Sequence, residues 1–136
     1  MVDILVGKQA TFSAAHYLPD HPKCGCIHGH TYFIRDLMVV TTQFVDLGDI
    51  KKTIGELDHM LIIPKDDAPV WNEIAKLYFE RLKIRIRFVL VDGPPTVETI
   101  AKLLKAMLQH LPGVAKAEFE LYEGPEWGYM TPNDPT

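Results

Sequence analysis

The residues best suited to chemistry lie close together near the N-terminus: Cys24, Cys26, His28 and His30 fall within seven positions. The apolar and β-branched residues after His30 predict that both histidines open a strand, where side chains two residues apart point to the same face. Two adjacent imidazoles can bind one Zn²⁺ but leave its coordination incomplete. His16 is the best candidate for a third ligand, because it closes an N-terminal strand that could pair with the strand at His28.

Three neutral imidazoles leave a fourth position on zinc for water or substrate, as in a catalytic site. The alternative is a structural site made of Cys24, Cys26, His28 and His30. Those four ligands would be crowded, because zinc fingers usually separate their ligand pairs by roughly a dozen or more residues. The three-histidine site is therefore the preferred hypothesis.

Three further groups could act with such a site. Asp58 and His59 are adjacent, and a carboxylate near an imidazole can fix its orientation and, beside a thiol, complete a Cys/His/Asp relay. Cys24 is the candidate thiol, since Lys23 or a nearby metal would favour the thiolate, although it could instead be a small buried hydrophobe. Glu123 ends the last expected strand, where a carboxylate can accept paired hydrogen bonds from an amino-pyrimidine ring or serve only in a turn.

The segment 83–91 has the alternation of a strand, with a row of basic side chains opposite an apolar row. The basic row comprises Lys83, Arg85 and Arg87. Such a row is typical of a solvated face, and it could instead attract an anionic substrate.

Length and composition predict a single domain over residues 1–136, with 47% hydrophobic and 24% charged residues and a net charge of −4. The negative charge argues against nucleic-acid binding, and no apolar run has the length of a membrane span. The two cysteines make no disulfide framework, and no signal peptide is evident, so a cytoplasmic location is expected. Residues 131–136 are expected to form a loose tail.

Periodicity predicts an α+β domain with about four strands and two or three helices. Strands are expected over 2–12, 28–40, 83–91 and 117–123, with a short return strand starting at 44–45. Helices are expected over 46–57, more weakly over 70–82, and after the N-cap Thr96 as far as Leu111.

Several short motifs occur in a family order. They are His16 after Phe12-Ser13-Ala14-Ala15, Cys24 ahead of His28-Gly29-His30, Val45-Asp46-Leu47-Gly48-Asp49, Leu57-Asp58-His59, Pro95-Thr96-Val97-Glu98 and Leu121-Tyr122-Glu123. Together, from residue 12 to residue 123, the chain resembles the pyruvoyl-tetrahydropterin synthase and carboxy-tetrahydropterin synthase family.

The resemblance implies a tunnelling fold, or T-fold: a four-stranded antiparallel sheet with helices on one face, closed into an oligomeric barrel. Three subunits would form one barrel and two barrels a homohexamer, which removes the exposed sheet edges. Active sites would lie between subunits, so relay members could come from different chains.

The resemblance also implies a role for each candidate residue. His16, His28 and His30 look like the zinc ligands, and Cys24 looks like the catalytic thiolate. Asp58 and His59 look like its relay. Glu123 looks like the anchor of the pterin ring, and Thr96 like a further contact to it.

The implied substrate is 7,8-dihydroneopterin triphosphate. Three residues separate Cys24 from His28, which resembles the queuosine-pathway enzymes that form 6-carboxy-5,6,7,8-tetrahydropterin with release of acetaldehyde and triphosphate. The alternatives are 6-pyruvoyl-tetrahydropterin synthesis, an archaeal-type cleavage of the dihydroneopterin side chain for folate synthesis, and a non-catalytic, zinc-stabilised oligomer that binds a pterin or purine.

The chain also departs from the family pattern. Residues 60–94 look like an insertion, the hairpin at 41–43 is short, and Cys26 is unusual at its position. These departures leave the substrate less firmly implied than the fold or the metal.

Overall fold

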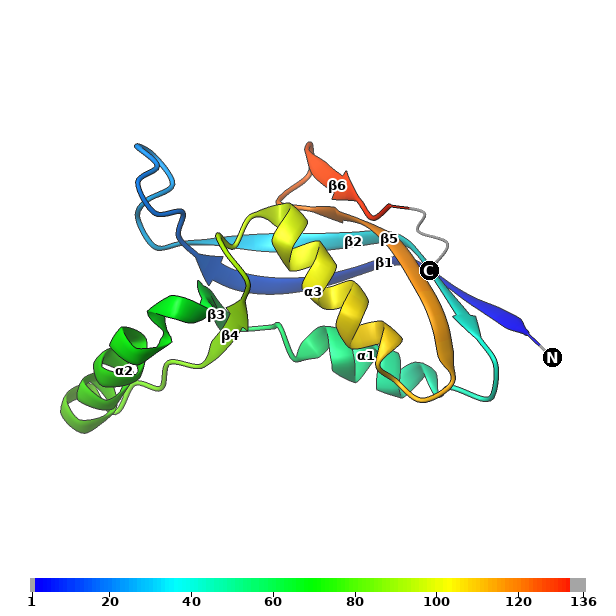
Figure 1. Cartoon of the computed structure of the whole chain (residues 1–136), viewed down its shortest axis with the longest axis horizontal. Coiled ribbons are helices and arrows are strands. Elements are labelled where there is room, and N and C mark those ends of the chain that lie inside the picture. Colours follow the sequence, from blue (N-terminus) through cyan, green and yellow to red (C-terminus); the bar gives the residue numbers. More distant parts are fainter. Residues whose placement is uncertain (1, 133–136) are drawn as a thin grey trace.

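The structure of the chain is a computed structural model that describes residues 2–132. In chain order the elements are β1 (Asp3–His16), β2 (His28–Thr41), α1 (Leu47–Gly55), β3 (Met60–Pro64), the short 3₁₀ helix η1 (Lys65–Asp67), α2 (Ala68–Leu82), β4 (Phe88–Val91), α3 (Val97–Gln109), β5 (Val114–Tyr122) and β6 (Gly128–Met130) (Figure 1). The α+β class is confirmed. Across the described residues, no helix is long and apolar enough to cross a membrane.

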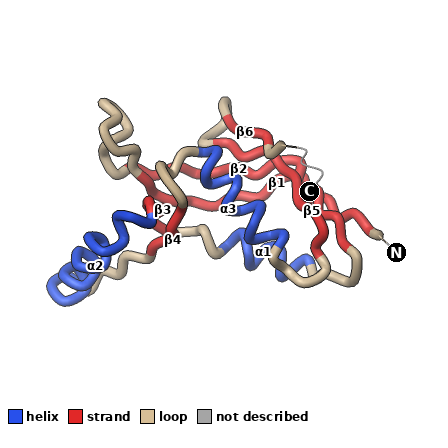
Figure 2. Tube along the Cα trace, in the orientation of Figure 1, coloured by secondary structure: helices blue, strands red, loops and turns tan. Residues whose placement is uncertain are grey.

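The strands form one curled sheet in the order β4-β3-β1-β2-β5-β6 (Figure 2). It has six strands rather than four, and it is mixed rather than purely antiparallel because β3 runs parallel to both β1 and β4. The apolar run of β3 is too short for periodicity to distinguish a strand from a buried turn. Strand β6 is shorter still, with three residues. Neither β3 nor β6 could therefore be predicted from its own sequence pattern.

Helices α1 and α3 cover one face of this sheet and enclose the core (Figure 1). Helix α1 begins where the Asp46 side chain accepts a hydrogen bond from the Gly48 N–H, and α3 begins at the predicted cap, Thr96. The inward side of α3 carries four buried residues: Ile100, Ala101, Leu104 and Leu108. Helix α2 departs from the expectation that all helices cover one face, because it projects from the end of the sheet and buries no residue.

Residues 60–94, the expected insertion, build β3, η1, α2 and β4. The strand predicted over 83–91 begins only at Phe88, because its partner β3 is five residues long and pairs from Leu61 with Phe88 onward. The residues before 87 therefore have no strand to pair with. The return strand expected at 44–45 is also wrong, because those residues lie in the loop that leads to α1.

Strand β1 leaves one long edge open. Its whole length pairs with β2, but β3 contacts only Ala14 and Ala15 at its end. The side chains also change face along it: Phe12 packs under the helices, whereas Ile4 and Val6 are 58% and 79% exposed. Within residues 2–132, an apolar strand edge is thus left without a partner.

The tail expected to be loose from residue 131 is tied down at its start. Thr131 is buried, and its hydroxyl contacts both the N–H and the carbonyl of Phe119. Residues 133–136 lie outside the described part of the chain.

Candidate metal centre and relay

The three predicted histidines meet at one end of the sheet. Strand pairing sets His16 opposite His28 and Ala14 opposite His30, so all three imidazoles emerge on the same face. Their ligand atoms lie within 4.8 Å of one another. The centroid of the His16 ring lies 4.6 Å from that of the His28 ring and 5.0 Å from that of the His30 ring. The predicted clustering, including the choice of His16 as third member, is confirmed.

Hydrogen bonds to backbone carbonyls fix the orientation of the His16 and His28 rings, and with it the nitrogen that each ring offers to a metal. His16 Nδ1 donates to the Pro95 carbonyl and His28 Nδ1 donates to the Cys26 carbonyl, each at 2.7 Å. The hydrogen on Nδ1 leaves Nε2 of both rings with a free lone pair. His16 Nε2 is buried without any hydrogen-bond partner, which is costly unless another group binds there.

The chemistry of this donor set fits zinc. Burial lowers the pKa of His16, which outweighs the raising effects of the Pro95 hydrogen bond and of Glu123, and this direction favours the neutral form that a metal ligand needs. Carbonyl acceptors behind ligating histidines are the usual support of such sites. Zn²⁺ would be held by His16, His28 and His30, and three protein ligands leave one of its usual four positions for water or substrate.

The two cysteines do not join the cluster among residues 2–132, which argues against the structural Cys₂His₂ alternative. Cys26 is exposed, and only its carbonyl takes part, through His28. Cys24 is half-buried in a tight loop, where its N–H donates to His21 Nδ1 and its carbonyl accepts from the Leu18 N–H. Gly25 is required there, because a Cβ would lie 2.7 Å from the His21 carbonyl oxygen.

Glu123 lies next to the histidine cluster, with Oε1 3.9 Å from His16 Nε2 and its side chain 31% exposed, while its role as the pterin anchor stays a prediction. Thr96 is close in sequence to the same cluster, through Pro95. Its hydroxyl, however, accepts from the Thr99 N–H and contacts the Thr99 hydroxyl. Thr96 therefore has an evident role in capping α3.

Tyr32 is a site residue that the sequence reasoning missed. Its ring stacks on Phe12 and lies 5.7 Å from the ring of His30, while its buried hydroxyl has no hydrogen-bond partner. Burial raises its pKa, so the hydroxyl stays neutral and can donate a hydrogen bond. The available signal was its position two residues after His30, on the same face of β2.

Asp58 and His59 form the predicted pair. Asp58 Oδ2 lies 2.8 Å from His59 Nδ1, and Asp58 Oδ1 accepts from the Ser13 N–H at 2.7 Å. The His59 N–H donates to the Ser13 carbonyl, so β1 holds both residues. His59 has φ 61°, a left-handed conformation that is uncommon for residues other than glycine and is often found at functional sites.

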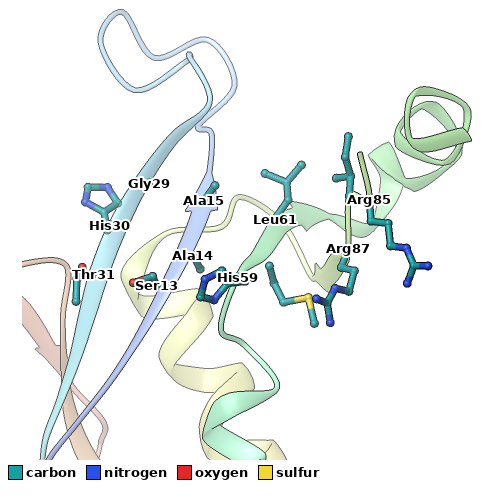
Figure 3. A pocket seen from close by; sticks show the side chains of 12 residues that line it. Ser13, Ala14, Ala15, Gly29, His30, Thr31, His59, Leu61, Arg85 and Arg87 are labelled. Atoms are coloured by element: carbon teal, nitrogen blue, oxygen red, sulfur yellow. The ribbon is translucent and has the colours of Figure 1, made fainter. Parts of the chain in front are cut away.

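The His59 ring is 78% exposed and lines an open cavity of about 500 Å³. Figure 3 shows His59 beside β1, with the ring of His30 turned to the other side of β2. In the described chain, no hydrogen bond or ion pair joins Cys24 to His59. The structure therefore forms the histidine cluster and the Asp58–His59 pair as two separate groups. It does not complete the relay between Cys24 and His59 within one subunit.

We expect a weak acid dependence of stability from Asp58. The Ser13 N–H, and then His59, hold the pKa of this carboxyl below its ordinary value, so its stabilisation is present above about pH 4 and is lost as the pH falls through the folded-state pKa. Asp58→Asn keeps an acceptor for the Ser13 N–H but loses the charge. Its cost near pH 7 should be no more than about 1 kcal/mol, because the carboxylate is 41% exposed.

Thermal unfolding of both proteins between pH 2 and 7 checks this expectation. The difference in Tm should shrink below pH 4. A difference that stays constant or grows as the pH falls would contradict the assigned role of the carboxylate.

Comparison with known proteins places these features in a family. Residues 5–131 match the family model described as 6-pyruvoyl tetrahydropterin synthase. A protein of Methanocaldococcus jannaschii with the provisional name 6-carboxy-5,6,7,8-tetrahydropterin synthase is 36% identical over 80 residues, which cover 51% of this chain and 49% of that protein. A protein of Archaeoglobus fulgidus with the same provisional name is 28% identical over 88 residues, covering 59% of this chain and 76% of that protein. The chain thus spans about half the length of the first relative.

Solved structures agree on the fold. The 6-pyruvoyl tetrahydropterin synthase of Plasmodium vivax superposes with a TM-score of 0.60 at 16% identity, covering 96% of both chains. The Plasmodium falciparum enzyme of the same name gives a TM-score of 0.59 at 16% identity, covering 95% of this chain and 96% of that one. At this identity the likeness concerns the fold alone.

Proposed function

Because the chain belongs to the 6-pyruvoyl tetrahydropterin synthase family, we propose that it is a zinc-dependent lyase of queuosine biosynthesis. Its substrates are 7,8-dihydroneopterin triphosphate and one water molecule, and its products are 6-carboxy-5,6,7,8-tetrahydropterin, acetaldehyde and triphosphate. The observation that carries the proposal is the buried, unpartnered Nε2 of His16, which faces two further imidazoles and lies near the carboxylate of Glu123.

Each residue of the site has one task in this reaction. Bound zinc would act as a Lewis acid that polarises the oxygens of the substrate side chain. Glu123 accepts hydrogen bonds from the amino-pyrimidine part of the pterin and so fixes the ring. Cys24 removes the carbon-bound proton beside the ring, and His59, oriented by Asp58, acts as the partner acid or base.

The choice of the carboxy-forming reaction is supported by two observations. Three residues separate Cys24 from His28, and two archaeal relatives carry the provisional name of the carboxy-forming enzyme. The solved Plasmodium neighbours carry the other name, but their identity to this chain is too low to bear on the product.

Mass spectrometry after incubation of the zinc-loaded protein with dihydroneopterin triphosphate tests the proposal. We expect 6-carboxytetrahydropterin together with acetaldehyde. A 6-pyruvoyl product without acetaldehyde would assign the other branch of the family. Zinc and pterin binding without any turnover would identify a non-catalytic binding oligomer.

We also propose that the subunit assembles into a homohexamer, as a dimer of trimers, in which Cys24 of one subunit meets the Asp58–His59 pair of another. The open apolar edge of β1 supports assembly, because such an edge invites pairing with a further strand. The separation of Cys24 from His59 within the subunit supports a shared site.

Assembly gives a further prediction. Light scattering should give a mass well above that of one chain at micromolar concentration, because a monomer would leave the β1 edge and the exposed Ile4 and Val6 in water. Val6→Lys should shift the distribution toward smaller species without unfolding the subunit, since Val6 is 79% exposed. A monomer mass for the unaltered protein across dilution would contradict the proposed assembly.

A further inference from the structure

We propose that Arg85 and Arg87 form a polyphosphate-binding site beside His59, which holds the triphosphate tail of the substrate. This inference rests on the proposed function and extends it, because the arginines belong to the segment 60–94 that looks like an insertion. The ligand class is a linear polyphosphate.

The backbone holds Arg87 at the His59 cavity, and Arg85, two residues earlier, lines the same cavity. The Leu61 N–H donates to the Arg87 carbonyl at 2.9 Å. Because Leu61 comes two residues after His59, this bond holds the backbone of Arg87 near His59. Arg85, Arg87 and His59 line the same cavity of about 500 Å³. Figure 3 shows β1 and β2 on one side of His59 and the two arginines on the other.

The guanidinium groups of Arg85 and Arg87 are free to bind an anion. Within residues 2–132, neither guanidinium forms an ion pair, and no acidic residue lines the cavity. Among the described residues, Arg85 has one aromatic neighbour: its guanidinium carbon lies 5.8 Å from the centroid of the Phe79 ring. Residues 81–87 include four basic side chains and no acidic one, in a chain whose net charge is −4. Two unpaired guanidinium forks suit phosphate oxygens.

The reaction places a polyanion in the same position. In the proposed function, His59 acts on the side chain of the substrate, and the triphosphate is bonded to the end of that side chain. Its phosphates therefore fall within reach of groups that share a cavity with His59. The lining contributed by β1 and β2 includes the small residues Ser13, Ala15 and Gly29, which leave room for a bulky tail.

A solvated basic face is the competing interpretation, and a matched pair of variants separates the two. Arg85→Gln/Arg87→Gln removes two charges from the cavity. Arg81→Gln/Lys83→Gln removes two charges from the same segment, but neither of these residues lines the cavity. A general electrostatic field would respond equally to both double variants, whereas a binding site responds only to the first.

The experiment is calorimetric titration of the zinc-loaded, assembled protein with inorganic triphosphate and, separately, with neopterin. Zinc content is measured after each titration, so that chelation by triphosphate is detected. We expect Arg85→Gln/Arg87→Gln to bind triphosphate about 10- to 100-fold more weakly, because charge-assisted hydrogen bonds are lost, while neopterin affinity stays the same. The control double variant should change triphosphate affinity less than about threefold, since screened charges outside the cavity act weakly.

Two results would overturn the inference: equal triphosphate affinity of both double variants, or no triphosphate binding by the unaltered protein. Failure of the proposed function looks different. If the proposed function is wrong, the unaltered protein would not convert the substrate or bind neopterin. Triphosphate binding would still depend on Arg85 and Arg87.

Discussion

His28→Ala should remove most of the bound zinc and with it the activity. The substitution deletes one of three converging nitrogens, and since loss of a mere supporting partner lowers metal affinity about 10- to 100-fold, loss of a ligand should cost more than that. The fold should persist, because His28 is only half-buried at the start of β2 and the core lies further along the sheet. Elemental analysis and circular dichroism of the purified variant measure both effects.

His110→Ala is the matched control, because His110 follows α3 and lies outside the histidine cluster. It should keep one zinc per chain. His30→Ala should behave like His28→Ala. Full zinc content in both His28→Ala and His30→Ala would refute the three-histidine centre.

Cys24→Ala should lower kcat by about 10²- to 10⁴-fold, the range that a positioned general acid or base contributes. Zinc content and neopterin affinity should stay unchanged, because the substitution touches neither the three imidazoles nor Glu123. Cys26→Ala is the matched control: its thiol is exposed, and only its backbone carbonyl supports His28. If Cys26→Ala is the inactive variant and Cys24→Ala is not, the role belongs to the other thiol.

The partner side of the relay needs a different substitution. His59 has a positive φ, so His59→Asn is preferable to alanine, because asparagine tolerates that conformation. It should also lower kcat. Mixing Cys24→Ala subunits with His59→Asn subunits, after dissociation and reassembly, should restore activity if each site combines residues from two chains. Mixed oligomers that stay inactive would contradict the shared site.

The histidine cluster could be predicted because it depends on strand alternation and on the pairing of two neighbouring strands. His28 and His30 share a face by strand alternation, and His16 ends the strand that pairs with theirs. The Asp58–His59 contact was less predictable, since neighbours in sequence need not touch. It depends on Ser13, which binds both residues from a strand that is distant in sequence.

The sequence was less informative where pairing partners decide the outcome. The alternation over residues 83–91 is real, but the strand is limited to four residues by the length of β3. For the same reason, the cavity role of Arg87 could not be read from its place in a basic row. That role follows from a backbone hydrogen bond to Leu61, which no local pattern indicates.

The projecting helix α2 is expected to unfold locally before the rest of the subunit. None of its side chains is fully buried, and it is held through the half-buried Trp71, whose Nε1–H donates to the Tyr17 hydroxyl. A fifteen-residue helix with so little core support is only marginally stable in water. In an isolated subunit, the amides of α2 can therefore exchange with solvent by local unfolding, while those of the sheet and of α3 await global unfolding. The subunit thus combines a rigid unit and a labile one, and the labile one leads directly into the segment that carries Arg85 and Arg87.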